Sequence, residues 1–148
     1  MIAFSDHPPS GIRAYVDRGW AGCRRTRKST SGGVLYFGGS AVRGWASTEA
    51  VHAMSSVEAE YYAVVTGAAE GLGLKSLAED LGWKLKVRIW TDSSGAKGAA
   101  ARRGLGKLRH VELKFLWVQE AVKAGRIEMK RVAGSVNPAD HFTKPKTK

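Results

Sequence analysis

One long helical segment places the strongest constraint on how this chain can fold. Residues 57–81 have the composition of a helix, and the segment ends at Gly82. Side chains three or four residues apart lie on one face of a helix. On one such face, all the residues are small: Ala63, Val64, Gly67 and Gly71. We therefore expect this face to pack closely on a β-sheet.

Segments rich in β-branched and aromatic residues lie on both sides of this helix. The predicted strands cover residues 12–17, 33–39, 41–47, 86–92 and 126–133. Further helices are predicted at residues 93–103, where Ser93 is the cap, at 110–125, and after the Asn137-Pro138 pair. The order β-β-β-α-β-α-α-β-α predicts an α/β fold with a mixed sheet and helices on its faces.

Length and composition fit one domain that binds a polyanion. A chain of 148 residues is long enough for a single core, and we expect residues 1–10 and 144–148 to be frayed. Its formal net charge is +11, which favours nucleic acid as a partner. A solubilising surface is the alternative. No apolar run suggests a membrane span, the start does not resemble a secretory signal, and Cys23 is the only cysteine. We expect the protein to be neither secreted nor membrane-bound.

Four acidic residues stand at positions where functional groups gather. Asp17 and Asp92 each end a predicted strand, Glu60 lies in the first turns of the long helix, and Asp140 lies on the terminal helix. Ligands of open α/β sheets lie at strand ends. Carboxylates brought together there would suit Mg²⁺, which prefers oxygen ligands. Acids at strand ends also act as turn or cap residues, and the spacing alone leaves both interpretations open.

Two glutamates near the start of the helix have different predicted roles. Ser55 and Glu58 match the capping box, in which a serine and a glutamate three residues later satisfy free backbone N–H groups. Glu60 lies two residues further on, so its side chain points about 200° away from that of Glu58. We expect Glu58 to be structural and Glu60 to face the sheet.

Six sequence blocks occur in an order that resembles one known family. They are VDRGWAG (16–22), RKSTSGG (27–33), SSVEAEY (55–61), WTDSSGA (90–96), RHVELKF (109–115) and NPADHFTKP (137–145). Together they resemble the ribonuclease H domain at the end of the polyprotein of copia-type LTR retrotransposons. The resemblance covers about residues 14–145.

The resemblance implies the ribonuclease H-like fold, a five-stranded mixed sheet whose first three strands are antiparallel, with helices on both faces. It implies hydrolysis of the RNA strand of RNA/DNA hybrids by two Mg²⁺ ions, for which Mn²⁺ can substitute. The catalytic, metal-binding acids of the family fall on Asp17, Glu60, Asp92 and Asp140.

The same resemblance implies a place in retrotransposon reverse transcription. The domain would be fused to, or processed from, a polyprotein with reverse transcriptase and integrase. It would act in a cytoplasmic virus-like particle or in the nucleus.

Three positions depart from the family pattern. Gly19 stands where a second acid is usual, so local geometry can differ although the metal-binding acid is retained as Asp17. His141 and Phe142 replace aliphatic residues. Cellular relatives have a histidine in the loop before the final helix, whereas residues 133–138 contain none, so no general acid is assigned.

Other residues are candidates for contact with nucleic acid. Ser56 and Ser94 are close in sequence to Glu60 and Asp92 and are candidates for the 2′-hydroxyl contacts that distinguish RNA from DNA. Trp20 is a candidate stacking platform. The candidates for phosphate contacts are Arg102, Arg103, Lys107 and Arg109. Helix capping is the structural alternative for the serines, and a solvated loop is the alternative for the basic residues.

Two other functions compete with this hypothesis. A decayed element could retain the fold and the charge as a non-catalytic nucleic-acid-binding protein, and Gly19 keeps that alternative open. A transposase or integrase core of the DDE type is disfavoured, because its acids run Asp, Asp, Glu along the chain. Here the order is Asp, Glu, Asp, Asp.

Overall fold

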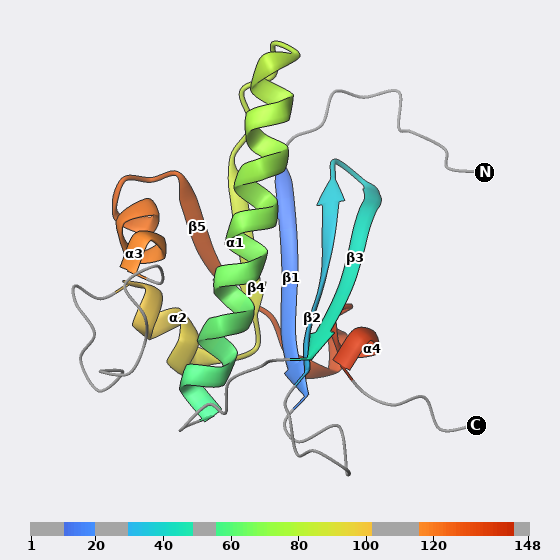
Figure 1. Ribbon diagram of the computed structural model, residues 1–148, viewed down its shortest axis with the longest axis vertical. Coiled ribbons are helices and arrows are strands. Elements are labelled where there is room, and N and C mark those ends of the chain that lie inside the picture. Colours follow the sequence, from blue (N-terminus) through green and yellow to red (C-terminus); the bar gives the residue numbers. More distant parts are fainter. Residues whose placement is uncertain (1–10, 20–29, 49–55, 102–115, 144–148) are drawn as a thin grey trace.

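Figure 1 shows a computed structural model of the chain, which describes residues 11–19, 30–48, 56–101 and 116–143. The strands are β1 (Ile12–Gly19), β2 (Thr30–Phe37), β3 (Ser40–Thr48), β4 (Val87–Thr91) and β5 (Ile127–Arg131). The helices are α1 (Ser56–Asp80), α2 (Ser94–Ala101), α3 (Leu116–Lys123), the 3₁₀ turn η2 (Gly134–Val136) and α4 (Asp140–Thr143). None of the described helices has the length and apolar character needed to cross a membrane.

The five strands form one mixed sheet in the order β3-β2-β1-β4-β5. β1 pairs with β2 and β2 with β3 in antiparallel register, whereas β1–β4 and β4–β5 are parallel. The predicted five-stranded sheet with three antiparallel strands first is therefore confirmed. β1 lies at the centre, so the ends of β1 and β4 are neighbours.

The predicted small-residue face of α1 packs against β1 and β4. Figure 1 shows this long helix lying across the sheet. A methyl group built on Gly67 would collide with Val16 of β1, and one on Gly71 would lie 2.7 Å from Val87 of β4. Ala63 and Val64 of the same face are buried. The missing side chains let α1 lie closer to the sheet than a helix with larger residues could.

α4 covers the opposite face of the sheet. Asp17 pairs with Gly32 in the β1–β2 register, and successive side chains along a strand point to opposite faces. A methyl group on Gly32 would collide with Phe142 and Thr143 of α4, whereas Val16 contacts α1. Helices therefore lie on both faces of the sheet, as predicted.

The observed elements differ from the predicted ones mainly at their ends. β2 begins at Thr30, three residues before the predicted start, because Thr30–Gly33 continue the pairing with β1. The hairpin turn lies at Gly38, whose φ is 61°. η2 was not predicted. Of the helix predicted at 110–125, the structure shows α3 (Leu116–Lys123). Residues 110–115 lie outside the described residues.

The contact of Gly67 with β1 gives a direct test of the packing. Gly67→Ala gains helix propensity, about 1 kcal/mol, but forces a methyl group into Val16, and overpacking of this kind costs about 1–3 kcal/mol. We expect net destabilisation in urea unfolding. Gly73→Ala is the matched control in the same helix, because nothing lies within 4 Å of its added methyl group. That variant should be as stable as the unmodified protein or more stable. Equal gains at both positions would contradict this packing.

Candidate metal centre

Three of the four predicted acids lie together at one edge of the sheet. Asp17 lies near the end of β1, Asp92 directly follows β4, and Glu60 lies in the first turns of α1. One carboxylate oxygen from each of these residues lies within 4.8 Å of the other two. Parallel β1 and β4 bring the aspartates to the same edge, and the packing of α1 brings the glutamate to them.

Asp17 is held in place by a residue from the far end of the chain. Asp17 is only 5% exposed. The hydroxyl of Thr143 donates a hydrogen bond to Asp17 Oδ2 at a distance of 2.5 Å. Asn137 binds the neighbouring backbone: its Nδ2 donates a hydrogen bond to the carbonyl of Val16 at a distance of 3.0 Å. The segment before and within α4 therefore fixes the end of β1.

Asp92 has close neighbours on two sides. A methyl group on Gly134 of η2 would lie 3.0 Å from Asp92 Oδ2, so a larger residue there would require the carboxylate to shift. The backbone N–H of Ser93 donates to the hydroxyl of Thr91, and the hydroxyl of Ser93 accepts from the N–H of Ala96. The cap of α2 thus begins one residue after Asp92 and fixes the backbone there.

Glu60 has an altered affinity for its proton. Burial, followed by the charges of Asp92 and Asp17, raises the pKa of Glu60 to about 8, although the nearby charge of Arg18 acts in the opposite direction. Glu60 therefore carries a proton at neutral pH when no cation is bound.

The residues present fit a divalent cation. Oε2 of Glu60 is buried and has no hydrogen-bond partner among the described residues, and Glu60 belongs to the group of three acids. A buried oxygen without a partner costs free energy, and a cation would satisfy it. Carboxylate oxygens at this spacing are the donors that Mg²⁺ and Mn²⁺ prefer.

Asp140 does not belong to the group of three described above. It begins α4, is half-buried, and lies one turn before Thr143, which binds Asp17. Its proposed role as a fourth ligand stays a prediction. The cap expected at Asn137 is present, since Asn137 Oδ1 accepts a hydrogen bond from the N–H of Ala139.

The predicted nucleic-acid contacts are described only in part. Ser94 is exposed at the start of α2, and Ser93 rather than Ser94 caps that helix, so capping does not explain Ser94. Ser56 begins α1, and its side chain is not among those described. The other candidates lie outside the described residues: Trp20, Arg102, Arg103, Lys107 and Arg109.

Sequence reasoning missed three residues around the acids. Thr143 and Gly134 contact Asp17 and Asp92 from far along the chain, and no local pattern marks them. Arg18 is charged yet only 7% exposed. Its signal was present in the sequence, because a charged residue inside a buried strand needs a compensating neighbour.

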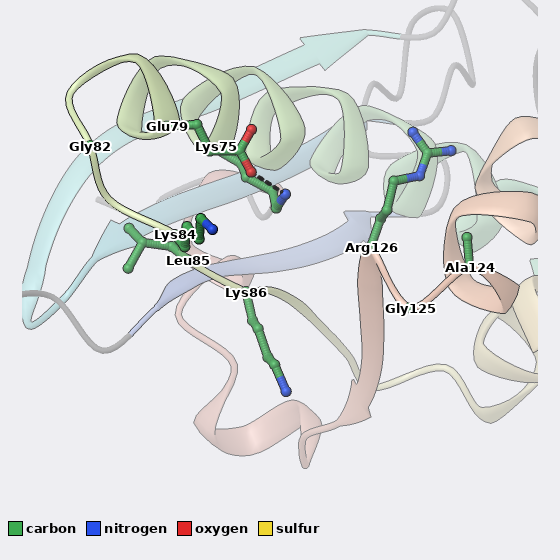
Figure 2. Close-up of a pocket in the computed structure, with 9 residues that line it drawn as sticks. All are labelled: Lys75, Glu79, Gly82, Lys84, Leu85, Lys86, Ala124, Gly125 and Arg126. Atoms are coloured by element: carbon green, nitrogen blue, oxygen red, sulfur yellow. Dashed lines mark hydrogen bonds and ion pairs between the residues drawn. The ribbon is translucent and has the colours of Figure 1, made fainter.

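A separate hollow lies at the other end of the strands, as Figure 2 shows in close-up. Its volume is about 620 Å³, and it lies between the end of α1 and the residues that precede β4 and β5. Its charged lining residues are Lys75, Glu79, Lys84, Lys86 and Arg126. Lys75 and Glu79 form an ion pair of 2.6 Å. The hollow is basic and is remote from the group of acids.

Comparison with known proteins agrees with the fold. No protein-family model matches the chain. The chain is 28% identical over 135 residues to the retrovirus-related Pol polyprotein from transposon TNT 1-94 of Nicotiana tabacum, covering 90% of this chain and 10% of that protein. It is 29% identical over 138 residues to the corresponding polyprotein from transposon RE1 of Arabidopsis thaliana, covering 90% and 9%. The chain is a homologue of retrotransposon Pol polyproteins. It spans about a tenth of the length of these relatives.

Solved structures with the same fold include ribonucleases H and a viral protease–reverse transcriptase. The RNase H1 of the archaeon Halobacterium salinarum is 19% identical, with a TM-score of 0.59 and coverage of 89% of this chain and 93% of that one. LC11-RNase H1, isolated from compost, is 15% identical, with a TM-score of 0.64 and coverage of 90% and 93%. The protease–reverse transcriptase of prototype foamy virus is 16% identical, with a TM-score of 0.57 and coverage of 93% and 20%. This retrotransposon Pol homologue therefore has the ribonuclease H fold, as the sequence resemblance implied.

The pKa of Glu60 predicts how stability depends on pH without metal. The folded-state pKa of about 8 lies above the unfolded value of 4.5, so proton uptake favours the folded state. This contribution is complete below about pH 4.5 and is lost as the pH rises through about 8. In the presence of EDTA, the melting temperature of Glu60→Gln should fall less over this range than that of the unmodified protein.

Glu58→Gln is the matched control for this measurement, because glutamine can make the capping contact that the sequence predicts for Glu58, whose side chain lies outside the described ones. It should keep the pH dependence of the unmodified protein. If Glu58→Gln flattens the curve and Glu60→Gln does not, the buried acid has been assigned two residues from its true position.

Proposed function

We propose that this retrotransposon Pol homologue is a ribonuclease H that hydrolyses the RNA strand of RNA/DNA hybrids with two Mg²⁺ ions. The observation that supports this most strongly is the group formed by Asp17, Glu60 and Asp92 on a ribonuclease H fold, with a buried oxygen of Glu60 left for a cation. One solved neighbour, LC11-RNase H1, has been determined in complex with an RNA/DNA hybrid.

Each acid would have a defined task. Asp17, Glu60 and Asp92 would hold the cations, and Asp140, at the start of α4, is proposed as a further ligand. When bound, divalent cations supply activation of water and stabilisation of the leaving oxygen in phosphodiester hydrolysis. Thr143 holds Asp17 Oδ2 by its hydrogen bond, so this carboxylate keeps its orientation without a cation.

Glu60 must lose its proton before it can act as a ligand. Its pKa of about 8 means that near neutral pH cation binding displaces a proton from its carboxyl group. The tightness of cation binding should therefore increase as the pH approaches 8. Burial keeps water away from Oε2, so little else competes for this oxygen.

Substrate selection would depend on backbone and sugar contacts. The exposed Ser94 lies two residues from Asp92 and is a candidate for the 2′-hydroxyl of RNA, with Ser56 as a second. Trp20 and the basic residues of 102–109 are proposed contacts for the bases and phosphates. Such contacts carry little base information, so we expect low sequence specificity.

The broader role follows from the relatives. The two relatives described above are retrovirus-related Pol polyproteins, so we propose that the domain works beside reverse transcriptase and integrase. It would remove template RNA in a virus-like particle or in the nucleus. A non-catalytic remnant remains the competing proposal, because Gly19 replaces an acid that is usual in the family.

Cleavage should depend on divalent cations. A labelled RNA/DNA hybrid should be cut with Mg²⁺ or Mn²⁺, left intact in EDTA, and cut poorly with Ca²⁺, whose looser coordination suits the reaction less well. Glu60→Gln should reduce the cleavage rate by roughly 10²-fold or more, because removing one electrostatic group from an active site typically lowers the rate by that factor. Glu58→Gln should cleave normally. Cleavage that persists in EDTA would rule out this mechanism.

Binding and cleavage should separate in Asp92→Asn. This variant should bind the hybrid about as well as the unmodified protein in a filter-binding assay and lose nearly all cleavage. Asp80→Asn is the matched control, because Asp80 is exposed at the far end of α1. It should keep both properties. Loss of hybrid binding in Asp92→Asn alone would show that this acid serves affinity rather than chemistry.

Salt dependence tests the proposed phosphate contacts. Hybrid affinity should fall steeply with salt concentration, because phosphate contacts release counterions. Replacing Arg102 and Arg103 by Ala should flatten the slope of log affinity against log salt by roughly one unit for each lost contact. An unchanged slope would place the hybrid on another surface.

A further inference from the structure

Arg18 is a buried cation beside the group of acids. It follows Asp17 in β1, and alternation along the strand places Arg18 on the same face as Val16, the face covered by α1. Val16 contacts Gly67, and Glu60 lies two turns before Gly67 in α1. Arg18 is two residues further along β1 than Val16, in the direction of the acids. The strand and the helix thus bring Arg18 and Glu60 together.

The charge of Arg18 is permanent and screened little by water. A guanidinium stays protonated throughout the pH range in which proteins are stable, and this residue is only 7% exposed. Its charge lies close to the acids, because Arg18 directly follows Asp17 in β1 and lies on the face of the sheet that α1, the helix of Glu60, covers. Arg18 therefore stabilises the ionised form of a residue that a cation would bind.

We propose that Arg18 is a built-in counterion of the Asp17–Glu60–Asp92 group, a positioning residue that supports this group without metal and weakens its binding of divalent cations. The proposal rests on the proposed function only in taking these acids as the metal site. It adds a residue that sets the affinity of that site.

Two opposite effects on the protein follow from this role. Without metal, one positive charge offsets repulsion among the carboxylates, so its removal should lower stability. With metal, the same charge repels an incoming divalent ion, so its removal should tighten binding. A residue that only filled space or bonded the backbone would lower stability without tightening the binding of cations.

The test measures cation binding directly, without substrate. Isothermal titration calorimetry with MgCl₂ and with MnCl₂ gives affinities, and melting temperatures are measured in EDTA and in saturating metal. Arg18→Gln should bind both ions on the order of tenfold more tightly, since one nearby charge in a shielded site readily changes an equilibrium by that factor. In EDTA its melting temperature should be lower than that of the unmodified protein, and saturating metal should raise its melting temperature by more.

Two variants serve as controls. Arg18→Lys keeps the charge and should bind cations with nearly unchanged affinity. Arg126→Gln removes one charge from an exposed residue that lines the basic hollow at the other end of the strands (Figure 2). It makes the same change in net charge and should leave the affinity unchanged. Tightening in Arg126→Gln equal to that in Arg18→Gln would show an effect of net charge alone and overturn the proposal.

Other outcomes are equally informative. Unchanged or weaker cation affinity in Arg18→Gln overturns the proposal. If this variant is unfolded in EDTA, Mg²⁺ or Mn²⁺ should restore its fold, and failure to do so also overturns it. A chain that binds cations as expected but never cleaves a hybrid contradicts the proposed function and leaves the role of Arg18 intact. If Arg18→Gln cleaves the hybrid normally and its cation affinity is unchanged, the proposed function stands and the proposed role of Arg18 is overturned.

Discussion

The close approach of α1 to the sheet determines where the candidate site can form. Gly67 and Gly71 leave room for Val16 and Val87, so the helix axis lies near β1 and β4. Glu60 is two turns from Gly67 on the same helix, and this packing therefore carries it to the strand ends where Asp17 and Asp92 lie. A helix held further away by larger side chains would leave the glutamate out of reach of the two aspartates. The same contact thus stabilises the core and sets the geometry of the acids.

Bringing three acids together has an energetic cost that the surrounding residues offset only in part. Thr143 donates to Asp17 and the charge of Arg18 favours the ionised form of Glu60, but burial still raises the pKa of Glu60 to about 8. A structure selected only for stability would gain from a neutral side chain at this position. Retention of an acid whose buried oxygen has no partner among the described residues argues for a bound cation. The instability of the metal-free group and its capacity to bind metal have one physical cause.

The elements of the fold and the proximity of three of the four acids could be predicted, because they follow from local patterns. Strand ends marked Asp17 and Asp92, and the small-residue face of the helix identified the side on which Glu60 lies. The resemblance supplied the strand order, which the alternation of hydrophobic residues alone does not fix. The contacts of Thr143 and Gly134 could not be predicted, since they join positions more than forty residues apart through tertiary packing. For the same reason, Asp140 could be assigned to the terminal helix but not placed relative to the other acids.

Net charge indicated a polyanionic partner but does not locate it. The formal charge of +11 suggests nucleic acid, yet the acids lie at one end of the strands and a basic hollow lined by Lys84, Lys86 and Arg126 lies at the other (Figure 2). Phosphates approaching the acids meet repulsion unless cations are bound there. A hybrid attracted by the whole protein would therefore be oriented by the cations more than by the average charge. Arg18 acts on the acids beside it, and because its charge is buried, salt screens that interaction far less than it screens those of the surface charges. Salt should therefore weaken the attraction of the hybrid to the surface much more than it alters the balance among the acids.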